Sequence, residues 1–154
     1  MNGALVRALR GWVVGAGIFN IAVAFPLANP FTSRYFYSCL NGLNRSLQLG
    51  GEQMRIPNGS EALMGNTVGL ALTLVGLLLL YAAADLPARI GIPLLNGLIR
   101  VAFALEVAYY VTYSNVAHIF IGIAVIDVIL AAALFYLSWR IMQQAHSGKL
   151  ENCE

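Results

Sequence analysis

The chain has 154 residues, of which 59% are hydrophobic and 10% are charged. A soluble domain averages about 45–50% apolar and about 25% charged residues, so this composition excludes a disordered chain and an ordinary soluble enzyme. The formal net charge of +2 is too small for a surface that follows nucleic-acid phosphates, and we expect no nucleic-acid partner. The composition predicts a small integral membrane protein whose main partner is the lipid bilayer.

Four apolar stretches are long enough to cross a bilayer, whose core of about 30 Å needs about 20 helical residues. The predicted spans cover residues 9–27, 60–84, 93–113 and 116–142. We therefore expect an all-α membrane protein, a four-transmembrane-helix bundle that forms one domain over residues 1–154. Arg7 and Arg10 before the first stretch also suit a secretory signal, but we interpret this stretch as a retained membrane anchor.

The loop between the first two spans is the longest part outside the membrane. Its apolar side chains recur at helical spacing, which predicts a short amphipathic helix on the outer membrane surface. These side chains are Tyr35, Phe36, Cys39, Leu40, Leu43 and Leu47. A helix that packs over the mouth of the bundle as a lid is the alternative.

The second span carries its own start, stop and packing signals. The segment from Asn58 to Glu61 reads as a capping box, and Pro87 follows the span because proline cannot continue a helix. Gly65 and Gly69, with Gly76 on the same face, allow a second helix backbone to approach closely. That second helix is either another span of this chain or the same span of a second copy.

The third span has polar residues along one side. On a helical wheel these residues share one half of the helix, and the other half is aliphatic. They are Asn96, Arg100, Glu106, Tyr109, Tyr110 and Tyr113. Polar side chains inside a membrane are costly, so this stripe is expected to face protein or water.

The turn at Ser114 and Asn115 makes the third and fourth spans an antiparallel hairpin. It predicts that Asp127 lies at a depth between Arg100 and Glu106, each about 4.5 Å away along the axis. Asn20 and Thr73 come to a similar depth in the first and second spans. The sequence therefore predicts a buried polar layer of Asn20, Thr73, Arg100, Glu106 and Asp127.

This layer suggests a site for acid–base chemistry. Arginine stays protonated in proteins, so Arg100 neutralises one carboxylate, most simply Asp127, and leaves Glu106 free to hold and release a proton. We assign Glu106 and Asp127 as candidate acid–base groups and Arg100 as the group that holds charge. The candidate ligand-binding residues are Asn20, Thr73, Asn96, Tyr109, Tyr110 and Tyr113. In the structural alternative, the Arg100–Asp127 pair only fixes the helix register and Glu106 bonds to a tyrosine.

Metal and cofactor motifs are not found in the sequence. The two histidines, His118 and His146, and the two cysteines, Cys39 and Cys153, form no ligand spacing, and we predict no metal and no cofactor.

Three functional classes fit these features. The first is a binding protein or enzyme for a lipophilic small molecule, with proton transfer of the isomerase or cyclase type. The second is a proton-coupled small-molecule transporter that works as a dimer, and the third is a non-catalytic accessory subunit of a larger membrane complex. Homo-oligomers therefore remain among the expected partners.

The loop charges predict the orientation. Arg7, Arg10, Arg89, Arg140 and Lys149 fall on one side of the four spans. Only three arginines fall on the other side, all in the first long loop. The positive-inside rule then puts both termini in the cytoplasm of a bacterial inner membrane or its equivalent.

Overall fold

The computed structural model describes the backbone of residues 3–150 and the side chains of residues 3–144, so Cys153 lies outside the described residues. The described part is all-helical, with α1 (Gly3–Ala28), α2 (Pro30–Ser46), α3 (Gly59–Ala84), α4 (Gly91–Ser114) and α5 (Ile119–Leu150). Four helices are long and apolar enough to cross a membrane: α1, α3, α4 and α5 from Ile119 to Gln144. The predicted all-α fold with four helices that could span a membrane is therefore confirmed, and these helices suggest an integral membrane protein.

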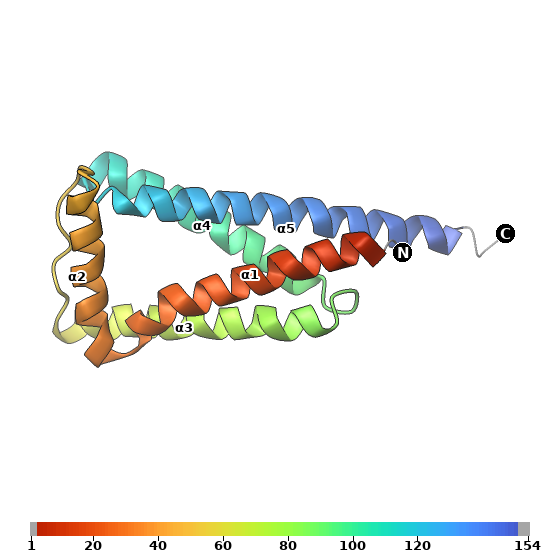
Figure 1. Cartoon of the computed structure of the whole chain (residues 1–154), viewed down its shortest axis with the longest axis horizontal. Helices are drawn as coiled ribbons and strands as arrows, with labels where there is room; N and C mark the ends of the chain where they lie inside the picture. The colour runs from red at the N-terminus through yellow and green to blue at the C-terminus, as the bar shows by residue number, and fades with distance from the viewer. Residues whose placement is uncertain (1–2, 151–154) are drawn as a thin grey trace.

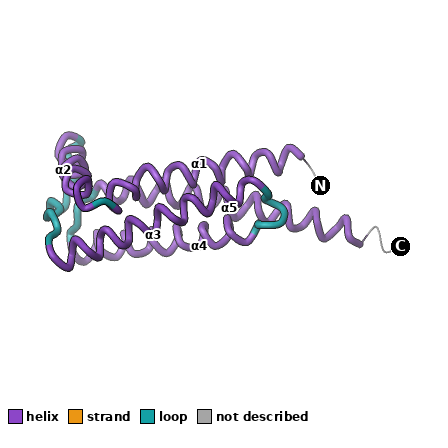
Figure 2. Tube along the Cα trace, turned by 90° about the horizontal axis from the view of Figure 1, so that it is seen from below, coloured by secondary structure: helices purple, strands orange, loops and turns teal. Residues whose placement is uncertain are grey.

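The four long helices form two pairs, with α1 against α3 and α4 against α5 (Figure 1). The pairs meet mainly where α1 packs on α5, and α3 touches α4 less. Helix α2 runs across one end of the bundle, at the opposite end from the start of α1 and the end of α5 (Figures 1 and 2). We call the part of the bundle next to α2 the α2 half, and the part that contains the start of α1 and the end of α5 the terminal half.

Glycines explain the close approach of α1 and α3. A Cβ on Gly76 would lie 2.8 Å from the Gly17 carbonyl oxygen, and a Cβ on Gly17 would lie 2.9 Å from the Gly76 carbonyl oxygen. A Cβ on Gly69 would meet the backbone of α1 at Ala28. This glycine face therefore packs inside the chain, and of the two alternatives the structure has the intramolecular one.

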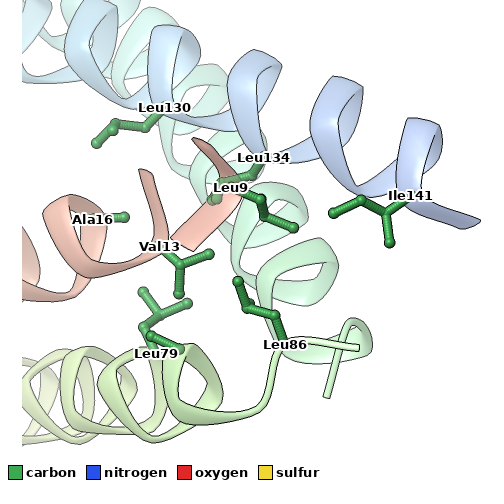
Figure 3. Packing of buried hydrophobic residues seen from close by; sticks show 9 residues of the cluster. Leu9, Val13, Ala16, Leu79, Leu86, Leu130, Leu134 and Ile141 are labelled. Atoms are coloured by element: carbon green, nitrogen blue, oxygen red, sulfur yellow. The ribbon is translucent and has the colours of Figure 1, made fainter. Parts of the chain in front are cut away.

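The hydrophobic core lies in the terminal half (Figure 3). It is made by Leu9, Val13, Ala16, Leu79, Ala83, Leu86, Leu130, Leu134 and Ile141. In the α2 half, the buried hydrophobic side chains among the described residues are small: Ala24, Val107, Ala117 and Ala124. Burial of large side chains stabilises a fold most, so the terminal half contributes most of the apolar packing.

Polar contacts hold α2 in place. Asn44 is buried, and its side-chain nitrogen donates to the carbonyl oxygens of Leu49 (3.2 Å) and Gly50 (3.3 Å). Its side-chain oxygen accepts from the Ile119 N–H at 2.9 Å, which ties α2 to the start of α5. The half-buried His118 donates its backbone N–H to Gly50 at 3.0 Å, which closes the same junction.

The ends of the helices follow the sequence in part. Helix α3 begins after Asn58 and ends at Ala84, before Pro87. The capping-box expectation is wrong in its mechanism, because the Asn58 side chain makes no capping hydrogen bond. A side-chain cap is found at a different helix, α2, where the side-chain oxygen of Asn29 accepts from the Phe31 N–H at 2.9 Å.

Candidate functional site

Arg100 is the centre of a buried polar cluster. It lies on α4 with 3% of its surface exposed, and its Nε donates to Asn96 Oδ1, one turn earlier, at 2.8 Å. Its Nη1 donates to Asp127 Oδ1 on α5, and the two groups form an ion pair. Its Nη2 donates to α1, at Asn20 Oδ1 (2.5 Å) and the Ala16 carbonyl oxygen (3.2 Å).

These bonds join α1, α4 and α5. A guanidinium has five N–H donors, and four hydrogen bonds use most of them. The Phe19 ring lies 5.7 Å from Arg100 Cζ and adds a cation–π contact. Asn96 and Asp127 are buried too and Asn20 is half-buried, so both charges of the cluster lie inside the bundle and balance each other. We call Asn20, Asn96, Arg100 and Asp127 the Arg100 cluster.

Thr73 does not join the Arg100 cluster. It is buried at mid-height in α3, as expected, but its hydroxyl donates to the Gly69 carbonyl oxygen of its own helix at 2.7 Å. This i to i−4 bond satisfies the hydroxyl locally. The expected polar layer therefore lacks a contribution from α3.

The expectation that Glu106 lies in the buried layer is wrong. Glu106 is exposed on α4, although Val107 beside it is buried. Adjacent helical residues point about 100° apart, and α4 buries only a narrow sector, made by Pro93, Asn96, Gly97, Arg100 and Val107. Glu106 points away from this sector, so its side chain is not part of the Arg100 cluster.

The three tyrosines of α4 lie near Glu106 on the exposed side. Their exposed fractions are 57% for Tyr109, 46% for Tyr110 and 75% for Tyr113. The Tyr109 ring lies 5.4 Å from the Tyr110 ring and 4.9 Å from the Tyr113 ring, centroid to centroid. Glu106 and these tyrosines form what we call the α4 outer face.

Three surface grooves accompany these features, and Arg100, Glu106 and Asp127 line none of the three. The first, of about 430 Å³, lies between α4 and α5, and Thr112 is its only lining residue with a polar side chain. The second, of about 500 Å³, lies between α1 and α5. The third, of about 650 Å³, lies at the start of α2.

Two partners in the Arg100 cluster were not found in the sequence. The Ala16 carbonyl is a backbone group, and no side-chain pattern marks it. Phe19 is an apolar residue of an apolar span, and no polar pattern in the sequence marks it as a neighbour of Arg100. The Ala16 carbonyl lies one turn before Asn20, so the backbone carbonyl one turn before a polar side chain of a span is the signal that could have indicated it.

Comparison of the chain with family models, with curated proteins and with solved structures finds no match.

Proposed function

We propose that this chain is a non-catalytic accessory subunit of a larger membrane complex, and that the α4 outer face binds a transmembrane helix of a different protein. The observation that carries this proposal is the exposure of Glu106 inside a spanning helix. Glu106 lies eight residues before the end of α4, which is about 12 Å along the axis and within the hydrocarbon core. An acidic side chain that faces lipid there costs about 2.5–3.5 kcal/mol on insertion scales.

A partner that covers Glu106 removes this cost. Such a partner would present a cation or a hydrogen-bond donor at the depth of Glu106, and the tyrosine rings would pack beside it. Among the side chains of residues 3–144, no free cation lies at that depth. Arg100 is already paired with Asp127, and Arg7, Arg10 and Arg140 lie in the terminal half.

This distribution of arginines favours a different protein over a second copy. A parallel second copy would bring its own Glu106 toward the first and no free cation. The glycine face of α3, which could have served a dimer, is occupied by α1. We therefore name the partner by its chemistry, as a membrane helix with a basic or strong donor side chain.

Photocrosslinking in native membranes tests the proposal. A photoreactive phenylalanine in place of Ala102, exposed one turn before Glu106, should form one discrete adduct with another membrane protein. The same residue in place of Leu77, exposed on α3, is the matched control and should form only lipid adducts. Glu106→Leu should remove the Ala102 adduct, and Glu106→Gln should keep part of it.

Two results would overturn the proposal. An adduct with twice the mass of the chain would identify a second copy as the occupant. Lipid adducts alone at both positions would mean that no protein covers the α4 outer face.

A site for a lipophilic small molecule is the second candidate. Its support is the apolar groove of about 430 Å³ between α4 and α5, which matches a small hydrophobic ligand in size. Isomerase- or cyclase-type proton transfer by Glu106 and Asp127 has less support, because Asp127 is paired and neither carboxylate lines the groove. A proton-coupled dimeric transporter has the least, because the α3 glycine face is taken.

We further propose that α2 is the amphipathic helix predicted for the outer membrane surface. It runs across the end of the spanning helices (Figure 1). Phe31 and Tyr35 on α2 and Leu47 just after it are largely exposed. The lid alternative has support from Ser33 and Asn44, which are buried toward the rest of the chain. The two roles are compatible when opposite faces of α2 serve them.

The proposed orientation has both termini in the cytoplasm of a bacterial inner membrane or its equivalent. It is supported by the arginines of the terminal half and by the position of α2 at the other end of the bundle (Figure 1). Labelling from outside intact cells of a cysteine placed at Arg45, in a variant with Cys39 and Cys153 replaced by serine, tests this orientation.

A further inference from the structure

The groove at the start of α2 has defined walls. Its lining residues are Pro30, Phe31, Arg34, Tyr35, Ser38 and Ile56, and its volume is about 650 Å³. One wall is the first turns of α2, and the other is the segment that returns toward α3. Asn41 holds this segment by two hydrogen bonds with Met54: its Nδ2 donates to the carbonyl oxygen (2.8 Å) and its Oδ1 accepts from the N–H (2.9 Å).

The groove combines one cation with apolar rings. Phe31 and Tyr35 are one turn apart and, at 81% and 77%, are the two most exposed of the large hydrophobic side chains that the structure describes. Arg34 lies between them in the sequence, and Ser38 follows Arg34 by one turn on the same side of α2. Arg100–Asp127 is the only ion pair among the described residues, so Arg34 has no carboxylate partner among them.

We propose that this groove binds the headgroup of an anionic phospholipid. The Arg34 guanidinium and the Ser38 hydroxyl would bind the phosphate, because a guanidinium forms forked hydrogen bonds with phosphate oxygens. Phe31, Tyr35 and Ile56 would contact the glycerol and the first acyl carbons. The inference rests on the proposed place of α2 at the membrane surface, where headgroups meet the ends of the spanning helices.

Lipid titration of the purified full chain in an uncharged detergent tests the site. Phosphatidylglycerol should bind about fivefold more tightly than phosphatidylcholine, the ratio that roughly 1 kcal/mol per basic residue gives. Arg34→Gln should remove this preference. Arg45→Gln, a matched control at the exposed far end of α2 and outside the groove, should keep it. Phe31→Ala should weaken the binding of both lipids.

Three outcomes would contradict the site. Arg34→Gln could keep the preference, Arg45→Gln could lose it equally, or inorganic phosphate at the lipid concentration could compete fully, which would mean a site for free phosphate. A Phe31→Trp variant in vesicles with brominated lipid separates the two proposals. The added tryptophan gives fluorescence beyond that of Trp12 and Trp139. If the brominated lipid does not quench this added fluorescence, the surface position of α2 is refuted. Quenching together with an unchanged Arg34→Gln titration refutes the headgroup site alone.

Discussion

The terminal half and the α2 half of the bundle are closed by different interactions. Large aliphatic side chains fill the terminal half, whereas the α2 half buries small side chains and is closed by hydrogen bonds around Asn44. The Arg100 cluster joins α1, α4 and α5 between them. The comparison shows two roles within one bundle: the apolar core stabilises the fold, and the hydrogen bonds at the other end hold α2 across the long helices.

Loss of Arg100 should have the largest effect on the comparison. Arg100→Met leaves Asp127 buried without a partner, and removal of one member of a buried pair costs about 3–5 kcal/mol. Thermal unfolding in detergent measures the loss. The double variant Arg100→Met/Asp127→Leu should recover most of it, because no charge stays buried. Equal destabilisation by the single and the double variant would refute the role of charge balance.

Core truncation should separate the two halves next. Leu134→Ala in the terminal half removes a fully buried side chain and should cost about 2–5 kcal/mol. Val107→Ala in the α2 half deletes fewer atoms at a 7% exposed position and should cost clearly less. Reversible unfolding in mixed micelles gives both values. A larger loss at Val107 would reverse our assignment of the apolar core to the terminal half.

The α1–α3 contact should tolerate no added side chain. Gly76→Ala puts a Cβ 2.8 Å from the Gly17 carbonyl oxygen, and such overpacking costs about 1–3 kcal/mol. Gly11→Ala is the control, since a Cβ there meets nothing within 4 Å. Its melting temperature should stay unchanged or rise, and a fall equal to that of Gly76→Ala would show that backbone approach is not the cause.

The junction of α2 should loosen locally when Asn44 is truncated. Asn44→Ala loses three hydrogen bonds, each of which contributes about 0.5–1.5 kcal/mol, and should speed amide exchange at Ile119. Hydrogen exchange followed by mass spectrometry checks the site. Ser46→Ala, which loses one exposed bond to Leu43, is the control and should leave the exchange of Ile119 unchanged.

Glu106→Gln should have the smallest effect on the isolated chain. The carboxylate is outside the Arg100 cluster and faces detergent in both the folded and the unfolded chain, so the free energy of unfolding should change by no more than about 0.5 kcal/mol. Thermal unfolding of Glu106→Gln is compared with that of Asp127→Asn, which should be clearly destabilised. A loss at Glu106 as large as that at Asp127 would return Glu106 to the buried layer.

The sequence predicted the parts of the fold that depend on hydropathy and on spacing. The four spans follow from lengths of apolar sequence, and the Arg100–Asp127 pair follows from depth and from the cost of a lone charge in a membrane. Asn20 and Asn96 could also be assigned, because each lies at a depth that Arg100 can reach.

The position of Glu106 could not be predicted in this way. A helical wheel gives the angle of each side chain but not the width of the sector that neighbours cover, and α4 has one main neighbour, α5. Thr73 failed for another reason, since a hydroxyl can bond to its own helix and need not reach a partner. The local bond is invisible to an argument based on depth alone.

The order in which the chain supplies the acceptors around Arg100 has a consequence for biosynthesis. Asn20 and the Ala16 carbonyl belong to α1, so they are already synthesised when Arg100 emerges, while Asp127 follows 27 residues later. During translation the guanidinium therefore meets neutral ligands first and its counter-ion last. Helix α5, the latest of the five helices described, therefore brings the carboxylate that neutralises Arg100.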